Sequence, residues 1–416
     1  MGSERTVRTA GAGLALLAIL MAPAGVAAAD ITVPDGFTIG VFHEGVGPAR
    51  QIAAGPDGTL YVKLRGAGLV ALRDADGDGR AEGMERFGDM AGTGVGVHAG
   101  WLYASSDTAV YRWALPEAGG APEGAPQTVI EGFPDQRQHA AKAFAFTPEG
   151  RIIVNVGAPS NACQQTMRTP GSPGLLPCPQ LERQAGLWAF PADADGLQQM
   201  AGERIATGTR NVLALATHPA TGVVHFVQHG RDQLDTLWPD HYDAEDNAEL
   251  PAEEMHRLDP GTDYGWPYTY WDGRAGVRRI APEYGGDGEK TAPAGKYPDP
   301  QVAFPAHWAP NQMAFYDAEA FPERYRGGAF VAFHGSWNRA PKPQAGYLVA
   351  FVPFADGVPA GGYERFADGF AGAADIARPN QADHRAMGVA VGPDGALYIS
   401  DSREGRIWRV TWTGEG

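Results

Sequence analysis

One histidine stands where a catalytic base could act. His139 lies in Asp135-Gln-Arg-Gln-His139-Ala, just before an expected strand over residues 144–154. An imidazole titrates near neutral pH, so a histidine on a loop entering an inner strand can take a proton from a substrate. The alternative is an ordinary loop histidine, because the chain holds 11 of them. His139 is therefore a candidate base.

Three arginines recur at similar places between strands. Arg210 follows Gly208-Thr and precedes Asn211, Arg339 ends His334-Gly-Ser-Trp-Asn-Arg339, and Arg385 follows His384. Guanidinium groups that converge on an otherwise acidic protein predict a local anion site, because their planar forks pair with carboxylates. The alternative is that each arginine pairs with one of the 49 acidic residues on a rim.

An acidic loop has the spacing of a calcium site. Asp74, Asp76 and Asp78 alternate, Gly79 follows, and five residues separate that glycine from Glu85, with Glu82 among the five. Alternating carboxylates of this kind converge on a hard cation in calcium loops. The flanking segments read as strands, so we expect a structural calcium inside a hairpin, and a solvated acidic turn is the alternative.

The only two cysteines, Cys163 and Cys178, lie in one segment rich in glycine and proline. In an oxidising compartment such a pair predicts a disulfide that closes a loop. The segment supplies too few further ligands for a metal site.

A repeated hairpin, made of a strand, a Pro-Gly turn and a second strand, must position these residues. The repeat occupies residues 52–62, 144–154, 213–226 and 389–399, with weaker copies at 95–113 and 313–333. Alternating apolar residues around such turns predict antiparallel hairpins. A unit of roughly 45 residues is typical of a four-stranded propeller blade. We therefore predict an all-β fold, a six-bladed β-propeller with long inserted loops, of which residues 231–310 are the largest.

The first 29 residues have the pattern of a secretory signal peptide. Arg5 and Arg8 are followed by an apolar run over residues 11–21 and by three alanines before Asp30. We expect cleavage there, which leaves residues 30–416 as a single propeller domain, exported to a periplasm or secreted, with no membrane anchor. The net charge of −16 argues against nucleic acid as a partner.

The chain resembles the soluble quinoprotein sugar dehydrogenases, the glucose/sorbosone dehydrogenase family of six-bladed propellers that use pyrroloquinoline quinone, and most of all their L-sorbosone dehydrogenase-like branch. The resemblance runs from Pro34 to Trp408. Its carriers are Gln138-His139, Gly208-Thr-Arg-Asn211, Gln228-His-Gly-Arg-Asp-Gln233, Tyr264-Gly-Trp-Pro267, Phe333-His-Gly-Ser-Trp-Asn-Arg339, and Arg385 ahead of Gly392-Pro-Asp-Gly395.

This resemblance implies roles for the candidate residues. His139 matches the base that takes the proton from the sugar C1 hydroxyl while hydride passes from C1 to C5 of the quinone. Arg210 and Asn211 match the pair that contacts the cofactor, with the arginine near the quinone oxygen. The backbone carbonyls of Gly230 and Arg231 match those that hold the calcium ion beside the quinone.

The resemblance extends to further positions. Arg385 matches an arginine that clamps a cofactor carboxylate, and Arg339 falls near a cofactor-binding lysine. Glu254 and Tyr264 correspond to parts of a second calcium site. Trp266, Trp308 and Trp337 are candidates for stacking on the quinone or a sugar, or for packing between blades.

Two positions depart from the glucose enzymes. Met387 stands where they carry a second arginine, so one carboxylate clamp is missing or supplied elsewhere. Gln138 stands where they have an aspartate before the base, so the orientation of His139 would rest on Asp135 or on another group.

The sequence thus predicts a quinoprotein dehydrogenase that oxidises an aldose or sorbosone-like sugar, uses pyrroloquinoline quinone and calcium, and passes electrons to a soluble acceptor. Two alternatives stay open. One is a hydrolase of the six-bladed lactonase type, and the other is a non-catalytic propeller that binds glycan or protein.

Overall fold

The hairpins of the repeat are fixed by their turns. In the first copy, the Gly55 amide donates to the Thr59 carbonyl at 2.7 Å, and the Asp57 carboxylate accepts from the Thr59 hydroxyl at 2.5 Å. Gly58 has a φ of +86°, in the left-handed region that favours glycine. The turn therefore reverses the chain and pairs strand β2 (Ala49–Ala54) with β3 (Leu60–Leu64). The computed structural model describes residues 1–2, 31–66 and 68–414, so the predicted signal peptide lies almost wholly outside the described residues.

Six sheets of four antiparallel strands form the blades, and we number the blades along the chain. Blade 1 contains β2, β3, β4 (Leu69–Arg73) and β5 (Gly83–Phe87). Blade 2 contains β6 (Val95–His98), β7 (Trp101–Ser105), β8 (Val110–Ala114) and β9 (Gln127–Glu131). Blade 3 contains β10 (Phe144–Phe146), β11 (Arg151–Val156), β12 (Gly186–Pro191) and β14 (Glu203–Thr207). Short strands β13 (Leu197–Gln198) and β18 (Thr262–Asp263) add parallel to β9 and β14.

The second half of the chain repeats the arrangement. Blade 4 contains β15 (Val212–Thr217), β16 (Val224–Gln228), β17 (Glu253–Arg257) and β21 (Val302–Phe304). Blade 5 contains β22 (Pro310–Phe315), β23 (Ala329–His334), β24 (Tyr347–Val352) and β27 (Glu364–Ala367). Blade 6 contains β28 (Ala386–Val391), β29 (Leu397–Asp401), β30 (Ile407–Trp412) and β1 (Phe37–His43). Five of the six predicted repeat copies form the first two strands of a blade, and the copy over residues 95–113 also reaches the third strand, β8. The predicted six-bladed β-propeller is confirmed.

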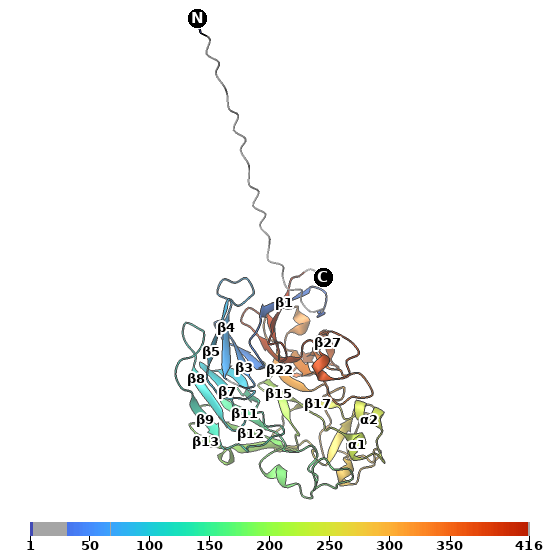
Figure 1. The fold of residues 1–416 in the computed structure, drawn as a ribbon. Helices are drawn as coiled ribbons and strands as arrows, with labels where there is room; N and C mark the ends of the chain where they lie inside the picture. Colours follow the sequence, from blue (N-terminus) through green and yellow to red (C-terminus); the bar gives the residue numbers. More distant parts are fainter. Residues whose placement is uncertain (3–30, 67, 415–416) are drawn as a thin grey trace.

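The first strands of the six blades line the centre. Each of β2, β6, β10, β15, β22 and β28 contacts the next, and β28 contacts β2, so the series closes on itself. The N-terminal strand β1 completes blade 6 by pairing with β30, from Phe37 opposite Trp412 onward. Figure 1 shows this junction, where blue β1 lies beside the red C-terminal strands. Apolar side chains fill the spaces between blades, with Phe37 packed against Phe321, Tyr325 and Phe366.

The segment predicted as the largest insertion, residues 231–310, is only partly an insertion. It contains two blade strands, β17 and β21. The sequence pattern did not reveal these strands, because no Pro-Gly hairpin marks the outer half of blade 4. Between and beside them lie helices α1 (Leu234–Leu237) and α2 (Ala244–Glu249) and the hairpin of β19 (Thr269–Asp272) and β20 (Val277–Ile280). A second small hairpin, β25 (Phe354–Ala355) and β26 (Val358–Pro359), follows β24. Single 3-10 turns occupy Pro179–Glu182, Gln199–Ala201, Pro282–Tyr284, Glu323–Tyr325 and Pro379–Gln381.

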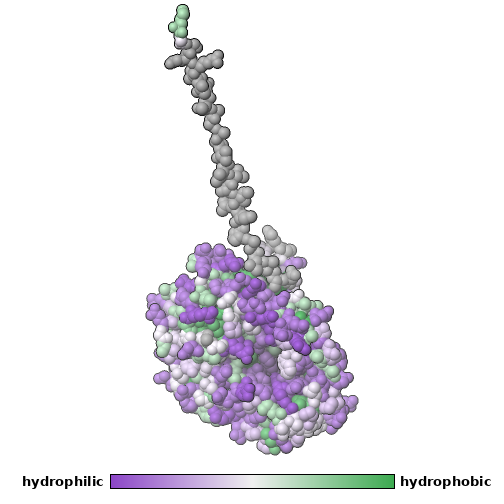
Figure 2. Space-filling model, viewed as in Figure 1, coloured by the Kyte–Doolittle hydropathy of each residue, from purple (hydrophilic) through white to green (hydrophobic). Residues whose placement is uncertain are grey.

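The face shown in Figure 2 is mainly hydrophilic, with small apolar patches between the polar residues. Among the described residues, no helix has the length and apolar character needed to cross a membrane.

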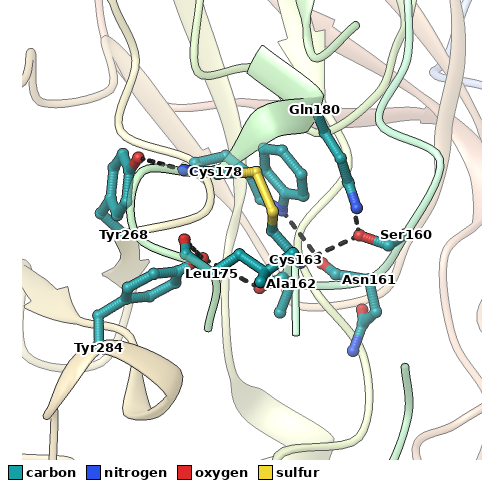
Figure 3. Close-up of a disulfide and its surroundings, with 10 residues drawn as sticks. Ser160, Asn161, Ala162, Cys163, Leu175, Cys178, Gln180, Tyr268 and Tyr284 are labelled. Carbon is teal, nitrogen blue, oxygen red and sulfur yellow. Dashed lines mark hydrogen bonds between the residues drawn. A yellow bond between two sulfur atoms is a disulfide. The ribbon is translucent and has the colours of Figure 1, made fainter. Parts of the chain in front are cut away.

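Cys163 and Cys178 form the predicted disulfide, in the loop that joins β11 to β12. Figure 3 shows how the loop is held on both sides of the bond. The Cys163 amide donates to the Ser160 hydroxyl at 3.0 Å, and the Cys178 amide donates to the Tyr268 hydroxyl at 3.2 Å. The loop is thereby fixed to the hairpin that begins at β19.

We expect the Cys163→Ser/Cys178→Ser double variant to unfold at lower denaturant concentration than the wild type. The two cysteines lie 15 residues apart, and in the chain-entropy account a loop of that length contributes roughly 3 kcal/mol to the free energy of unfolding. Denaturant titration measures the change. Reductant should lower the midpoint of the wild type and leave that of the variant unchanged, and equal midpoints without reductant would contradict the expectation.

Candidate functional site

The chain enters the first strand and leaves the second strand of each blade at the same end of the propeller. Arg210 lies two residues before β15, and Arg385 directly precedes β28. Arg50 lies at the start of β2, and Arg65 directly follows β3. The closed ring of first strands therefore gathers these arginines at one end of the central axis, which is the end where His139 precedes β10.

The His139 ring is held in one orientation by the backbone. Its Nδ1 lies 2.6 Å from the Ala158 carbonyl oxygen, which only accepts, so Nδ1 carries the hydrogen and Nε2 keeps its lone pair. The residue has a φ of +51°, a left-handed conformation that a non-glycine residue adopts at a cost. Burial, and then the charge of Arg210, hold the pKa of His139 well below its usual range. The imidazole is thus neutral at physiological pH, with Nε2 free to accept a proton.

Arg210 and Asp232 form the charged centre beside His139. The Arg210 Nη2 donates to the Asp232 Oδ2 at 2.8 Å, and the arginine side chain is almost fully buried. Asp232 Oδ2 also lies 3.4 Å from Arg168 Nη2, and Asp232 Oδ1 accepts from Asn338 Nδ2 at 3.2 Å. Although burial alone would raise it, the pKa of Asp232 is lowered to about 2, with Arg210 the largest opposing influence. Asp232 therefore stays ionised, and its Oδ2 lies close to the guanidinium groups of both Arg210 and Arg168.

A pocket of about 320 Å³ opens beside the base. His139 and Asn211 line it together with Arg50, Arg65 and Arg137. Within residues 31–66 and 68–414 none of these three arginines forms an ion pair, and Arg50 makes only a 3.4 Å contact from Nε to the Thr93 hydroxyl. Asp107 is the one acidic residue among those that line the pocket. The pocket therefore carries an excess of positive charge.

Arg385 adds to this charge from blade 6. Its guanidinium donates to the carbonyls of His334, at 2.9 Å, and Gly335, at 3.1 Å. Burial, with Arg65 and Arg385 nearby, lowers the pKa of Arg50 to about 10. Because like charges disfavour each other, a bound anion would relieve this repulsion. We refer to Arg50, Arg65, Arg137 and Arg385 as the arginine cluster.

Met387, which stands where the glucose enzymes carry a second arginine, adds no charge to the arginine cluster. It is fully buried, and its sulfur lies 3.0 Å from the Asn311 side-chain nitrogen. Arg50 stands on the neighbouring first strand, which contacts β28. Arg50 thus places a positive charge on blade 1 that acts on Arg385 of blade 6.

The backbone turn at Gly230 and Arg231 offers free oxygens. No described residue donates a hydrogen bond to either carbonyl. The Gly230 amide donates to Glu253 Oε2 at 2.8 Å, and the same carboxyl group accepts from the Ala309 amide at 3.1 Å, which fixes the turn. Burial raises the pKa of Glu253 to about 8. Carbonyl oxygens without donors suit calcium, so the turn fits the predicted role.

Glu254 and Tyr264, which the resemblance assigns to a second calcium site, already have other partners in the structure. Glu254 Oε2 accepts from Arg278 Nη2 at 2.6 Å and lies 3.0 Å from His256 Nε2, so its charge is already matched. The Tyr264 hydroxyl donates to the Arg257 carbonyl at 2.7 Å. Both residues line a cavity of about 20 Å³, enough for a water molecule.

Arg339 does not belong to the arginine cluster, contrary to the sequence prediction. Its Nη2 pairs with Glu249 Oε1 at 2.8 Å, and its Nη1 donates to the Ala248 carbonyl at 2.8 Å. The side chain therefore joins α2 to the loop after β23. With further bonds to the carbonyls of Pro343 and Ala306, four of the five N–H donors of this guanidinium are engaged.

The acidic loop brings together a different set from the one predicted. Asp74, Asp76, Asp78 and Glu82 each place an oxygen within 4.8 Å of the others. Glu85 is not among them, because it lies in β5 opposite Ala71, and its carboxylate accepts from the Ala121 amide at 3.0 Å. The structural calcium of this loop stays a prediction, with Glu82 in place of Glu85.

The three tryptophans differ in exposure. Trp308 packs in the apolar core, and Trp266 is buried with its Nε1 donating to the Asn161 carbonyl at 3.0 Å. Trp337 is 54% exposed and precedes Asn338, which contacts Asp232. Trp337 is therefore the one of the three whose ring faces are open to a ligand.

Sequence reasoning missed Arg50, Arg65, Arg137 and Asp232. Arg50 offered a signal, since it stands near the start of the first repeat copy as Arg210 and Arg385 stand near theirs. Asp232 lies within the motif Gln228-His-Gly-Arg-Asp-Gln233, but a single carboxylate in a motif gives no signal of the arginines that it binds.

The residues present fit a planar tricarboxylate with a calcium ion. The arginine cluster lacks ion-pair partners among the described residues, and three carboxylates would supply them. The unpaired carbonyls of Gly230 and Arg231 lie two or fewer residues from Asp232, whose carboxylate holds Arg210 at 2.8 Å.

Two of the curated proteins that are similar to this chain in sequence come from a bacterium and a fungus. An uncharacterised protein of Borreliella burgdorferi is 25% identical over 210 residues, covering 50% of this chain and 48% of that protein. A pyrroloquinoline quinone-dependent pyranose dehydrogenase of Coprinopsis cinerea is 24% identical over 345 residues, covering 78% of this chain and 45% of that protein. The chain thus spans about half the length of the curated relatives it matches.

Solved structures share the fold over nearly the whole chain. The Trichoderma reesei member of carbohydrate-active enzyme family AA12 has a TM-score of 0.75 at 18% identity, covering 94% of this chain and all of that one. The quinone domain of the Coprinopsis cinerea pyranose dehydrogenase has a TM-score of 0.73 at 19% identity, covering 92% and 97%. The soluble aldose sugar dehydrogenase of Escherichia coli has a TM-score of 0.58 at 15% identity, covering 90% and 99%. The family model described as TrAA12-like matches residues 31–413, and the chain belongs to that family.

Proposed function

We propose that the protein is a quinoprotein dehydrogenase that oxidises an aldose or a sorbosone-like sugar, with pyrroloquinoline quinone and calcium as cofactors and His139 as general base. The observation that carries the proposal is the neutral His139 imidazole, with Nε2 free, beside an arginine cluster that has no ion-pair partners among the described residues. The named relatives include quinone-dependent sugar dehydrogenases, which supports the same reaction class.

Each group of the site has a part in this reaction. The arginine cluster and Asn211 would hold the cofactor, and the carbonyls of Gly230 and Arg231 would hold calcium. Pyrroloquinoline quinone, when bound, supplies the two-electron acceptor for hydride, and calcium polarises the reacting carbonyl.

The chain's own residues handle the proton and the charge. His139 Nε2 takes the proton of the sugar hydroxyl, because Nδ1 is committed to the Ala158 carbonyl. Arg210 stabilises negative charge that develops nearby, and its salt bridge to Asp232 keeps it in place. The open ring of Trp337 stacks on a sugar or on the cofactor.

Export to a periplasm or secretion, transfer of electrons to a soluble acceptor, and a single propeller domain complete the proposal. The disulfide supports an oxidising compartment.

The proposal is tested by an assay with and without the cofactor. Purified protein, calcium and the quinone are given a panel of aldoses and an artificial electron acceptor. We expect dye reduction that falls by roughly 10²–10⁴-fold in His139→Ala, the usual contribution of a general base, while quinone binding persists. His43→Gln is the matched control, because its Nδ1 also contacts a backbone carbonyl, at 3.2 Å from Ala81, but on the outermost strand of blade 6.

Other outcomes would contradict the proposal. Opening of a lactone without quinone would indicate the hydrolase. Glycan retention with no turnover would indicate a binding propeller. Unchanged activity in His139→Ala would remove the base from the mechanism.

We expect the rate to stay constant at mildly acidic pH. The base works only when neutral, and the pKa of His139 is depressed, so the imidazole is neutral above a pKa well below 6.5 and activity declines only as the pH falls through that value. In Arg210→Gln the nearby positive charge is gone, so the pKa of His139 should rise. The acid limb of log(kcat/KM) against pH should therefore shift to higher pH. A limb that stays in place would show that Arg210 does not act on His139.

We expect Arg50→Gln and Arg385→Gln each to weaken quinone binding by roughly tenfold or more, because a hydrogen bond to a charged group contributes about 1.5–3 kcal/mol. Fluorescence titration of the apoprotein with the quinone measures the change. Arg324→Gln is the control, since that arginine pairs with Glu364 on the exposed edge of blade 5. Equal affinities in all three variants would place the cofactor elsewhere.

A further inference from the structure

Asn161 uses nearly all of its polar atoms on two residues of the site. It is fully buried. Its carbonyl accepts from Arg210 Nε at 3.2 Å, and its Oδ1 accepts from Arg210 Nη2 at 3.0 Å. The two contacts grip the guanidinium along one edge, so the plane of the group is fixed as well as its position.

The same side chain grips the backbone of Asp232. Asn161 Oδ1 accepts from the Asp232 amide at 2.9 Å, and Asn161 Nδ2 donates to the Asp232 carbonyl at 2.9 Å. The amide thus pairs with a backbone unit in both directions, as a neighbouring strand would. This unit directly follows Gly230 and Arg231, the carbonyls that fit calcium.

The loop that carries Asn161 is itself anchored. The disulfide begins two residues later at Cys163, and the Ser160 hydroxyl donates to Gln180 Oε1 at 2.7 Å while accepting the Cys163 amide at 3.0 Å. Figure 3 shows Ser160, Asn161 and the disulfide side by side. The Asn161 carbonyl also accepts from Trp266 Nε1. Asn161 is therefore held from blade 3 while it contacts residues of blade 4.

We propose that Asn161, anchored by the Cys163–Cys178 loop, is the positioning residue that holds Arg210 in register with the turn at Gly230 to Asp232. The inference rests on the proposed function for its catalytic meaning and on the hydrogen bonds alone for its geometry. A neutral amide suits this place, because it both donates and accepts, whereas a carboxylate would face the Asp232 carbonyl without a hydrogen to give.

The test compares Asn161→Ala, Asn161→Asp and a control. Gln199→Ala is the control, because Gln199 is also a buried amide that contacts a guanidinium and a carbonyl, both of Arg183, away from the site. We expect Asn161→Ala to lose roughly 10–100-fold in quinone affinity and in kcat/KM, the usual effect of losing a residue that orients a ligand. Asn161→Asp retains the Oδ1 contact to Arg210, so it should recover quinone affinity without recovering the melting temperature.

A measurement on the apoprotein makes the inference independent of turnover. NMR titration of ring-labelled histidine follows His139, which faces Arg210, His229 and Asp232. In Asn161→Ala the guanidinium loosens, so the His139 titration should move toward 6.5, while Gln199→Ala should leave it unchanged.

The outcomes separate the two proposals. If the wild type neither binds quinone nor oxidises sugars, the proposed function fails, and the His139 titration still decides the role of Asn161. If quinone affinity follows melting temperature across all variants, or if the titration in Asn161→Ala equals that of the control, the positioning role is overturned.

Discussion

The pairing of β1 with β30 is the constraint on which the site depends. It gives blade 6 its outermost strand from the start of the chain and closes the ring of first strands. A propeller has no core at its axis, and what holds the blades is apolar packing between neighbouring sheets. Only in a closed ring do the starts of six first strands face one another. Arg50 on blade 1 and Arg385 on blade 6 are neighbours solely because of that closure.

The end of the propeller at which the first strands begin concentrates positive charge, although the net charge of the protein is −16. Burying like charges together costs free energy, which is visible in the lowered pKa of Arg50. Asp232 offsets part of this cost by binding Arg210 and Arg168 at once. The arginine cluster keeps the remainder, because none of its four members forms an ion pair among the described residues. Preorganised cations of this kind stabilise bound or developing anions without rearranging.

Local turns made much of the fold predictable, because a Pro-Gly hairpin needs only neighbouring residues. The same locality explains the errors. Glu85 satisfies a calcium-loop spacing, yet the strand that begins at Gly83 carries it into the sheet and leaves Glu82 in the loop. Arg339 sits in a motif that resembles a cofactor loop, yet α2 lies close enough to take its guanidinium. Spacing along the chain cannot show which element distant in the sequence contacts a given side chain.

The sequence by itself determined the hairpins, their repetition six times, the two cysteines that pair and the residue that could act as base, since each depends on residue type and short-range spacing. The tertiary structure decided the tautomer of His139 through the Ala158 carbonyl, the membership of the arginine cluster, and the clamp of Asn161 on Arg210 and Asp232. The first of these contacts joins the two ends of the β10–β11 hairpin, and the others join different blades. No local pattern encodes them, because they depend on how the loops meet and how the sheets pack around one axis.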